Sequence, residues 1–269
     1  MIENFVFKEH YRLEDLLDIM AKLRGEGGCA WDAQQTHESI RKNFIEETYE
    51  VIEAIDNRDT ELLKEELGDV LMQVVFHTQM EKEAGRFDFD DVCDGVCKKL
   101  VERHPHVFGN VVAETPEEVL KNWDEIKKQK KGQKSQSEVI NTIPRQLPAL
   151  MRAAKVQQKA AKTGFDFDSA GDTLDKLEEE TGELREALSR KKPEEITDEL
   201  GDILFSAVNT ARFIGVEPEE ALTRATDKFI RRFVVVERLA AERGIDMQTA
   251  GLAQLDLLWD EAKELLQSN

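Results

Sequence analysis

Acidic side chains recur in this chain at a fixed distance along the sequence, and carboxylates are groups that can hold metal ions or move protons. Each acid of a first set returns as the same residue type 133 positions later (residue 46 to residue 179). The pairs are Glu46 and Glu179, Glu47 and Glu180, Glu50 and Glu183, Glu66 and Glu199, and Asp69 and Asp202. Because the duplication keeps the positions of acids as well as apolar residues, it predicts an acidic site in each repeat.

The later acids of each repeat lie on a segment with the pattern of a mostly apolar helix. From residue 67 to residue 76 nearly every side chain is apolar, and the polar residues share a stripe about 80° wide. The stripe consists of Glu66, Asp69, Gln73 and His77, and in the second copy of Glu199, Asp202 and Ser206. A helix that is apolar around most of its circumference is usually buried, so we expect these carboxylates to face a cavity or a partner.

The earlier acids of each repeat are less decisive when they are considered alone. Glu46, Glu47 and Glu50 span about 100° opposite an apolar face, as the acids of a plain amphipathic helix with a solvated face also would. The repeat favours a site, because these acids return in position whereas neighbouring charges do not. Lys42 returns as Asp175, and Asp56 returns as Ser189.

Clustered carboxylates need compensation. Two of them 4 Å apart repel by about 4 kcal/mol at an effective dielectric of ~20, so four that converge cost on the order of 10 kcal/mol, which rivals the stability of a domain. The site must be protonated, paired with bases or filled by divalent cations. Few lysines and arginines lie on the acid helices, which favours cations, and oxygen ligands at positions i and i+3 suit Mg²⁺ or Mn²⁺.

Two other kinds of phosphate or metal chemistry are disfavoured by missing motifs. The chain has no Glu-x-x-His pair, which weakens a ferritin-like di-iron site. It also has no Gly-x-x-x-x-Gly-Lys-Ser/Thr loop, which excludes a P-loop ATPase. Cys93 and Cys97 precede His104 and His106, but this spacing matches no zinc finger and has no counterpart in the second repeat. Buried free thiols are therefore the favoured interpretation.

Composition and periodicity predict a helical protein of two domains. Two repeats of about 130 residues within 269 fit the usual domain size, and helical periodicity dominates. We expect an all-α fold with four or so main helices in each repeat. The polar, basic stretch that ends in two prolines predicts a linker at 132–148, between domains at 1–131 and 149–269. Thr115 and Asp172 are the expected N-caps of two helices.

Net charge and the distribution of apolar residues limit the partners. With 37 basic and 56 acidic residues the net charge is −19, which disfavours general nucleic-acid binding, although a small phosphorylated ligand can bind through cations. No apolar run approaches the ~20 residues of a membrane span, and the first residues lack signal-peptide features. Three cysteines with no disulfide framework favour the cytoplasm. The wide apolar helix faces predict a homodimer.

The ordered acids resemble a family signature. Glu-Glu-x-x-Glu followed sixteen residues later by Glu-x-x-Asp is similar to the pattern of the MazG nucleoside triphosphate pyrophosphohydrolases, part of the all-α NTP pyrophosphatase group. The resemblance covers nearly the whole chain as two tandem four-helix-bundle domains, and residues 27–32, 103–109 and 228–233 are similar to further landmarks. It implies hydrolysis of NTP or dNTP to the monophosphate and pyrophosphate with Mg²⁺, which Mn²⁺ can replace, in cleansing or regulating nucleotide pools.

The resemblance also implies roles for individual residues. The metal ligands would be Glu180, Glu183, Glu199 and Asp202, with Glu47, Glu50, Glu66 and Asp69 as their counterparts in the first repeat. Glu179 would act beside Glu180 in catalysis, as a further ligand or as the base that orients water. The substrate contacts would be Lys176, Glu179, Asp198, Lys228, Arg231, Arg232, Trp259 and Lys263.

The first copy departs from the basic part of this pattern. Residues 97–104 read CysLysLysLeuValGluArgHis, whereas residues 228–233 read LysPheIleArgArgPhe. We therefore predict that the second repeat carries most of the activity and that the first is weaker or supports assembly.

Other interpretations of these residues remain open at this stage. Trp259 can equally fill the core, the basic residues can form a solvated face, and the histidines at 104 and 106 can be local structure. The chain could also be a non-catalytic helical interaction module, or a phosphohydrolase that acts on dUTP or a phosphoribosyl compound.

Overall fold

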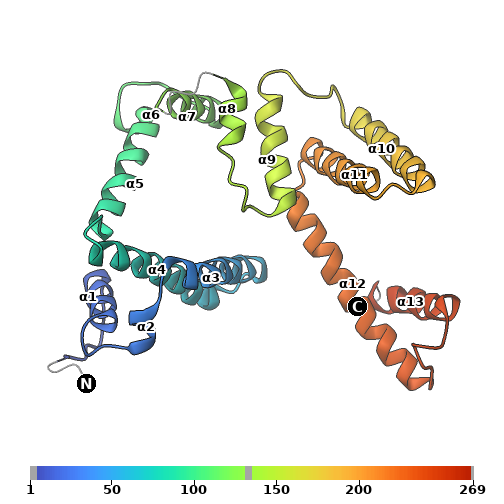
Figure 1. The fold of residues 1–269 in the computed structure, drawn as a ribbon, viewed down its shortest axis with the longest axis horizontal. Coiled ribbons are helices and arrows are strands. Elements are labelled where there is room, and N and C mark those ends of the chain that lie inside the picture. Colours follow the sequence, from blue (N-terminus) through green and yellow to red (C-terminus); the bar gives the residue numbers. More distant parts are fainter. Residues whose placement is uncertain (1–4, 131–134, 268–269) are drawn as a thin grey trace. The chain divides into compact units, whose positions relative to one another are not determined.

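The structure, a computed structural model, describes residues 5–130 and 135–267 (Figure 1). Within these ranges it contains thirteen helices and no strand, which confirms the all-α prediction. The chain divides into two compact units, Met1–Lys127 and Lys128–Asn269. None of the described helices combines the length and the apolar character that crossing a membrane requires.

The first unit is built around two long helices. Its helices are α1 (Leu13–Arg24), α2 (Ala30–Gln34), α3 (His37–Asn57), α4 (Thr60–Glu83), α5 (Phe89–Arg103), α6 (Pro105–Phe108) and α7 (Pro116–Lys130), which ends just beyond the unit boundary. The second unit contains α8 (Gln136–Asn141), α9 (Ala149–Ala161), α10 (Ala170–Arg190), α11 (Pro193–Phe213), α12 (Pro218–Glu242) and α13 (Leu252–Gln267).

Helices α3 and α4 form a hairpin because a very short turn joins them. Arg58 adopts the left-handed conformation with φ 55°, and the Asp59 carboxylate accepts hydrogen bonds from the backbone N–H groups of Glu61 and Leu62 at 3.1 and 3.0 Å. A turn of this length makes the two helices antiparallel, and they pack side by side (Figure 1). The hairpin therefore brings the acids of α3 opposite those of α4.

Helices α10 and α11 repeat this hairpin in the second unit. They begin 133 residues after α3 and α4 (37 to 170 and 60 to 193), and Lys191 at the turn has φ 54°. The N-cap of α10 is Ser169, whose hydroxyl accepts a hydrogen bond from the backbone N–H of Asp172 at 3.2 Å. The predicted cap at Asp172 is therefore wrong by three positions. Thr115 is confirmed as an N-cap, since it accepts from the Glu118 N–H at 3.3 Å.

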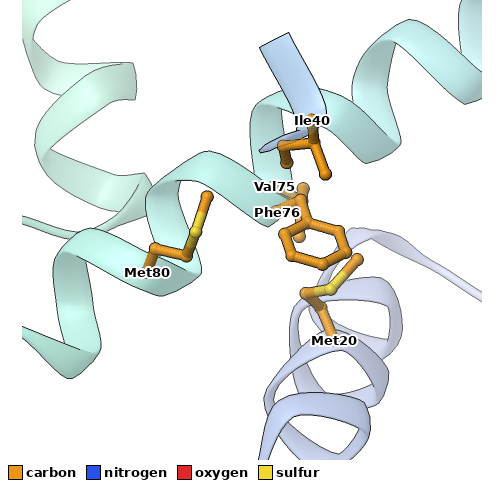
Figure 2. Packing of buried hydrophobic residues seen from close by; sticks show 5 residues of the cluster. All are labelled: Met20, Ile40, Val75, Phe76 and Met80. Atoms are coloured by element: carbon orange, nitrogen blue, oxygen red, sulfur yellow. The ribbon is translucent and has the colours of Figure 1, made fainter. Parts of the chain in front are cut away.

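Hydrophobic cores lie at the hairpin of the first unit and between α12 and α13 of the second. The first core is formed by Met20, Ile40, Val75, Phe76 and Met80 (Figure 2). These residues come from α1, α3 and α4, so α1 is packed onto the hairpin. The second core is formed by Val236, Leu239, Ala240, Leu258 and Ala262.

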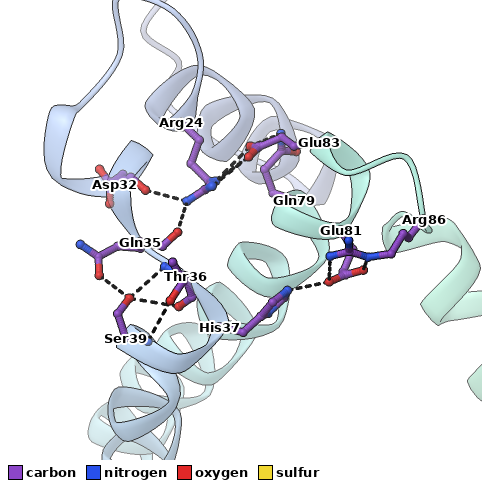
Figure 3. A network of polar contacts seen from close by, with 10 residues as sticks. All are labelled: Arg24, Asp32, Gln35, Thr36, His37, Ser39, Gln79, Glu81, Glu83 and Arg86. Atoms are coloured by element: carbon purple, nitrogen blue, oxygen red, sulfur yellow. Dashed lines mark hydrogen bonds and ion pairs between the residues drawn. The ribbon is translucent and has the colours of Figure 1, made fainter.

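An arginine at the end of α1 connects α2 to the hairpin. The Arg24 guanidinium donates to the Glu83 carboxylate at 2.8 Å and to the backbone carbonyl of Asp32 at 2.6 Å (Figure 3). It also lies over the Phe76 ring. In the second unit, Arg212 of α11 pairs with the carboxylate of Asp166. An arginine thus fixes the loop before the acid helix in both units, although it comes from a different helix in each.

The segment predicted to be a linker contains a short helix. Ser135 caps α8 by accepting from the Glu138 N–H at 3.2 Å, so a turn of helix forms inside the polar stretch. Residue 131 and the first linker residues, 132–134, lie outside the described residues. The domain limits at 131 and 149 stay a prediction.

The acid helices are less buried than their periodicity predicts. Leu67 of α4 is 52% exposed, and Leu200 and Leu204 of α11 are 49% and 51% exposed. Ile45 of α3 is 53% exposed. Each hairpin packs through one face and leaves apolar side chains of another face accessible, because two helices cannot enclose one another.

Candidate functional site

The first hairpin gathers three of the predicted ligands. Glu47 of α3 and Glu66 and Asp69 of α4 each place a carboxylate oxygen within 4.8 Å of the others. Burial raises the pKa of Glu66, and the charges of Glu50 and Asp69 raise it further. Burial also raises the pKa of Glu47, followed by its hydrogen bond with Glu50. Glu50 therefore lies beside the cluster. The raised pKa values mean that ionising these carboxylates costs free energy.

Gln73 extends this cluster by one turn of α4. Its side chain is 5% exposed, and its amide makes a hydrogen bond with Glu47. In the described part of the chain its Oε1 atom is buried with no hydrogen-bond partner. A buried acceptor of this kind is rare in folded proteins and usually has a water, an ion or a ligand as its partner. The arrangement therefore fits a hydrated divalent cation held by oxygen ligands.

The second hairpin gathers the equivalent carboxylates. Glu180 of α10 and Glu199 and Asp202 of α11 bring oxygens within 4.8 Å of one another. Glu180 is 6% exposed, whereas Asp202 is exposed, so the cluster opens to solvent on one side. Burial raises the pKa of Glu183, and the charges of Glu180 and Glu199 contribute in the same direction. All four predicted ligands of this repeat thus lie together.

A lysine enters the second cluster. The Nζ atom of Lys176 lies 2.9 Å from Oε1 of Glu179 and 2.9 Å from Oε1 of Glu180. These two hydrogen bonds raise the pKa of Lys176. The few basic residues on the acid helices thus include one that pairs with a predicted ligand of this repeat. In the first repeat the equivalent position (176 minus 133) is Asn43, which carries no charge.

The basic residues predicted to hold phosphates lie on α12. Lys228 and Arg231 are exposed and line an open groove of about 680 Å³, together with residues of the preceding turn. Among the described residues no ion pair joins Lys228, Arg231 or Arg232 to the carboxylates of α10 and α11. The fold thus groups the acids within a hairpin and places the basic residues on a separate helix.

Helices α5 and α12 are the third helices of the two repeats when α3 and α10 are counted as the first, and their N-caps reveal an equivalence that is not apparent from the sequence. Asp88 caps α5 and Glu217 precedes α12, an offset of 129, which pairs Lys99 with Lys228 and Arg103 with Arg232. Cation–π contacts agree with this alignment. The Arg103 guanidinium lies 5.3 Å from the Trp123 ring centre, and that of Arg232 lies 5.8 Å from the Trp259 ring centre.

The other three residues that were predicted to contact the substrate lie on α11 and α13. Trp259 is partly buried against the core of α12 and α13, with its ring 5.0 Å from the Phe229 ring, so it contributes to packing. Lys263 pairs with Asp260 at 2.8 Å. Asp198 is exposed on α11, one residue before Glu199.

The cysteine and histidine group of α5 and α6 forms no metal cluster among the described residues. Cys93 is half-buried and Cys97 is exposed, so the prediction of a buried thiol is wrong for Cys97. The ring of His104 packs edge-on against Trp123, with ring centres 5.0 Å apart. His104 thus has a local structural contact.

The sequence did not predict a polar network at the far end of the first hairpin, which is the end opposite the turn between α3 and α4. His37 Nδ1 lies 2.7 Å from His77 Nδ1, and His37 Nε2 lies 2.6 Å from the Glu81 carboxylate. Arg86 donates to the same carboxylate at 2.5 and 2.7 Å (Figure 3). The sequence signalled only that His77 continues the stripe, because its partner lies forty residues away.

The fold and these clusters define an all-α protein of two repeats, each with a helix hairpin that gathers carboxylates suited to divalent cations. A family model described as the MazG nucleotide pyrophosphohydrolase domain matches residues 35–108 and 160–235, which include both hairpins. The chain belongs to the MazG family.

Similar proteins match over nearly the whole chain. The chain is 46% identical over 250 residues to the nucleoside triphosphate pyrophosphohydrolase/pyrophosphatase MazG of Thermotoga maritima, covering 93% of this chain and 95% of that protein. It is 45% identical over 257 residues to the nucleoside triphosphate pyrophosphohydrolase of Escherichia coli K12, covering 94% and 97%.

Proposed function

We propose that this protein is a Mg²⁺-dependent nucleoside triphosphate pyrophosphohydrolase, which converts NTP or dNTP and water into the monophosphate and pyrophosphate. The observation that carries the proposal is the convergence of Glu180, Glu199 and Asp202 within 4.8 Å on one hairpin. Membership of the MazG family and the names of the two relatives support the same activity.

The second repeat supplies groups for each part of this reaction. Glu180, Glu183, Glu199 and Asp202 would hold the cations. Bound Mg²⁺ would supply a link between the acidic protein and the phosphates, a water of lowered pKa and stabilisation of the departing pyrophosphate. Glu179, exposed beside Glu180, would orient the attacking water.

Basic and aromatic side chains would position the nucleotide. Lys228, Arg231 and Arg232 would donate charged hydrogen bonds to phosphate oxygens, and Lys176 would add a further ammonium group from α10. Trp259, Lys263 and Asp198 would contact the rest of the nucleotide. This assignment needs α12 and the hairpin to meet around the substrate.

A homodimer would provide further surface around the substrate, beside α12 and the hairpin. Each hairpin exposes apolar side chains, among them Ile45 in the first repeat and Leu204 in the second. Exposed apolar faces of this width usually contact a partner. We propose that a second copy of the chain covers them, and that the enzyme acts on nucleotide pools in the cytoplasm.

We propose further that the second repeat carries most of the activity. Its third helix has Arg231 where the first repeat has Glu102 (231 minus 129), which reverses the charge next to the triphosphate. The first repeat would then turn over NTP more slowly or support assembly.

Pyrophosphate release from a panel of NTPs and dNTPs tests the proposal. The intact protein should release pyrophosphate only with Mg²⁺ or Mn²⁺ present, and Glu180→Gln and Glu183→Gln should each lower the rate at least ~100-fold, as expected for lost metal ligands. Near-normal rates in these variants would refute the site assignment. Release confined to dUTP would identify a different phosphohydrolase, and no release would leave an interaction module as the function.

A further inference from the structure

We infer that the two repeats differ in how they take up divalent cations. The cluster of the first repeat binds a cation without nucleotide, whereas in the second repeat Lys176 opposes the cation until a triphosphate draws its ammonium group away. The inference for the second repeat rests on the proposed function, and that for the first repeat does not.

The charge inside the two clusters differs at the position of Lys176. Lys176 bonds both Glu179 and Glu180 at 2.9 Å, and Glu180 is one of the three converging ligands. The equivalent residue in the first repeat is Asn43. In the described part of the first repeat no lysine or arginine is paired with Glu47, Glu66 or Asp69, and Lys42 pairs instead with the exposed Glu46 at 3.2 Å.

A buried amide side chain beside the first cluster indicates a ligand there. Gln73 is 5% exposed, contacts Glu47 and leaves Oε1 without a partner among the described residues. The second repeat has the shorter Ser206 at this position. Among the described residues the first cluster thus has neither a lysine or arginine paired with its acids nor a donor for this oxygen, and a hydrated divalent ion supplies both.

The charge of Lys176 should lower the affinity of the second cluster for a divalent cation by a measurable factor. A unit positive charge within hydrogen-bond distance of a ligand carboxylate disfavours a second cation there, and at an effective dielectric of ~20 the effect on affinity is at least ~10-fold. The remaining carboxylates are the same in both repeats. Without nucleotide, the first cluster should therefore bind divalent cations more tightly than the second.

A bound nucleotide gives Lys176 of the second repeat another anion to pair with. A lysine is a compact charge on a flexible stem, so it can exchange a carboxylate for another anion. A triphosphate offers Lys176 phosphate oxygens and frees Glu180 for the cation. Cation and nucleotide then bind cooperatively in the second repeat, and each raises the affinity for the other by the same factor.

Mn²⁺ binding to the intact, chelator-treated protein tests the inference, with free Mn²⁺ counted by electron paramagnetic resonance. Wild type without nucleotide should show a tight class of sites that Asn43→Lys weakens at least ~10-fold. Lys176→Asn should add a second tight class, whereas the charge-conserving control Lys176→Arg should not. A non-hydrolysable NTP analogue should produce the second class in wild type.

Three results would overturn the inference: equal Mn²⁺ affinity of both repeats without nucleotide, no weakening in folded Asn43→Lys, or no gain in Lys176→Asn. If Asn43→Lys does not fold, Gln73→Met provides the second test, since it removes the unpartnered acceptor and should also weaken the tight class. Pyrophosphate release by wild type separates the two proposals. Release with equal Mn²⁺ affinities refutes only the inference, and unequal affinities without release refute only the proposed enzyme activity.

Discussion

The two repeats place the same carboxylates on the same hairpin but surround them with different neighbours. Glu47, Glu66 and Asp69 converge beside a buried, unpartnered Gln73, whereas the second cluster is partly neutralised by Lys176. The Glu-x-x-Glu and Glu-x-x-Asp pattern thus sets where the ligands lie, while single residues outside it set the charge that a cation meets.

The third helices differ for a reason that lies in one proline. Helix α5 ends at Arg103 because Pro105 follows, and a residue before proline avoids helical geometry, as His104 does with ψ 56°. In α12 the equivalent position is Val234 (105 plus 129), and the helix continues to Glu242. The second repeat thus presents its basic residues in the interior of a long helix, where the first presents them at a helix end.

The largest expected effect comes from removing one ligand in each repeat. Asp202→Asn should lower pyrophosphate release at least ~100-fold, because an amide cannot replace an anionic cation ligand. Asp69→Asn, the same change in the first repeat, should leave the rate within about 3-fold under saturating Mg²⁺, where the unchanged second site limits the rate. Steady-state assays of both purified variants measure the difference, and an equal loss in both would show that the repeats share the chemistry.

A smaller effect should follow from the basic residues. Lys228→Ala should lower kcat/KM about 10- to 100-fold through the loss of a charged hydrogen bond to phosphate. Lys99→Ala, at the equivalent position of α5, should change kcat/KM less than about 2-fold, within the range of a surface substitution. Initial rates at low NTP measure both variants. A larger loss in Lys99→Ala would place the main phosphate site in the first repeat.

Without metal, the two clusters should also differ in how much they destabilise the folded protein. Because the pKa of Glu66 is raised in the folded state, the folded protein holds this proton more tightly than the unfolded chain. The contribution of Glu66 to stability is therefore greatest at low pH and falls as pH rises above 4.5 through the raised pKa. In chelator, Glu66→Gln should melt several degrees above wild type at neutral pH, and excess Mg²⁺ should remove this advantage.

Calorimetry across pH checks this prediction, with Glu199→Gln as the matched change in the second repeat. Lys176 partly neutralises that cluster, so Glu199→Gln should raise the melting temperature less than Glu66→Gln does. A lower melting temperature for Glu66→Gln in chelator would contradict the view that its cluster is uncompensated.

The smallest effect should come from the network at the far end of the first hairpin. Arg86 and His37 lower the pKa of Glu81 to about 2, so the stability from this carboxylate is present above 4.5 and lost as pH falls toward the folded value. The second repeat has Ile214 in its place (81 plus 133). Glu81→Gln should flatten the acid limb of the stability profile in urea titrations, and an unchanged acid limb would show that the network contributes nothing.

The sequence predicted the acids of both sites because an exact repeat of ligand positions is visible without a structure. It predicted the helices that carry them because helical periodicity reports which residues share a face. The pairing of Lys176 with Glu180 was missed although their i,i+4 spacing signals it. The contact of His37 with His77 and the half-exposed leucines of α4 and α11 depend on tertiary packing, which periodicity does not contain.

The claim that bound divalent cations drive hydrolysis of NTP is tested most directly by ³¹P NMR. The phosphorus products of the intact protein are recorded first in chelator and then after Mg²⁺ is added. We expect no reaction in chelator and, after Mg²⁺ is added, the nucleoside monophosphate and pyrophosphate as the only phosphorus products. Turnover in chelator, or release of orthophosphate with a nucleoside diphosphate, would contradict this claim.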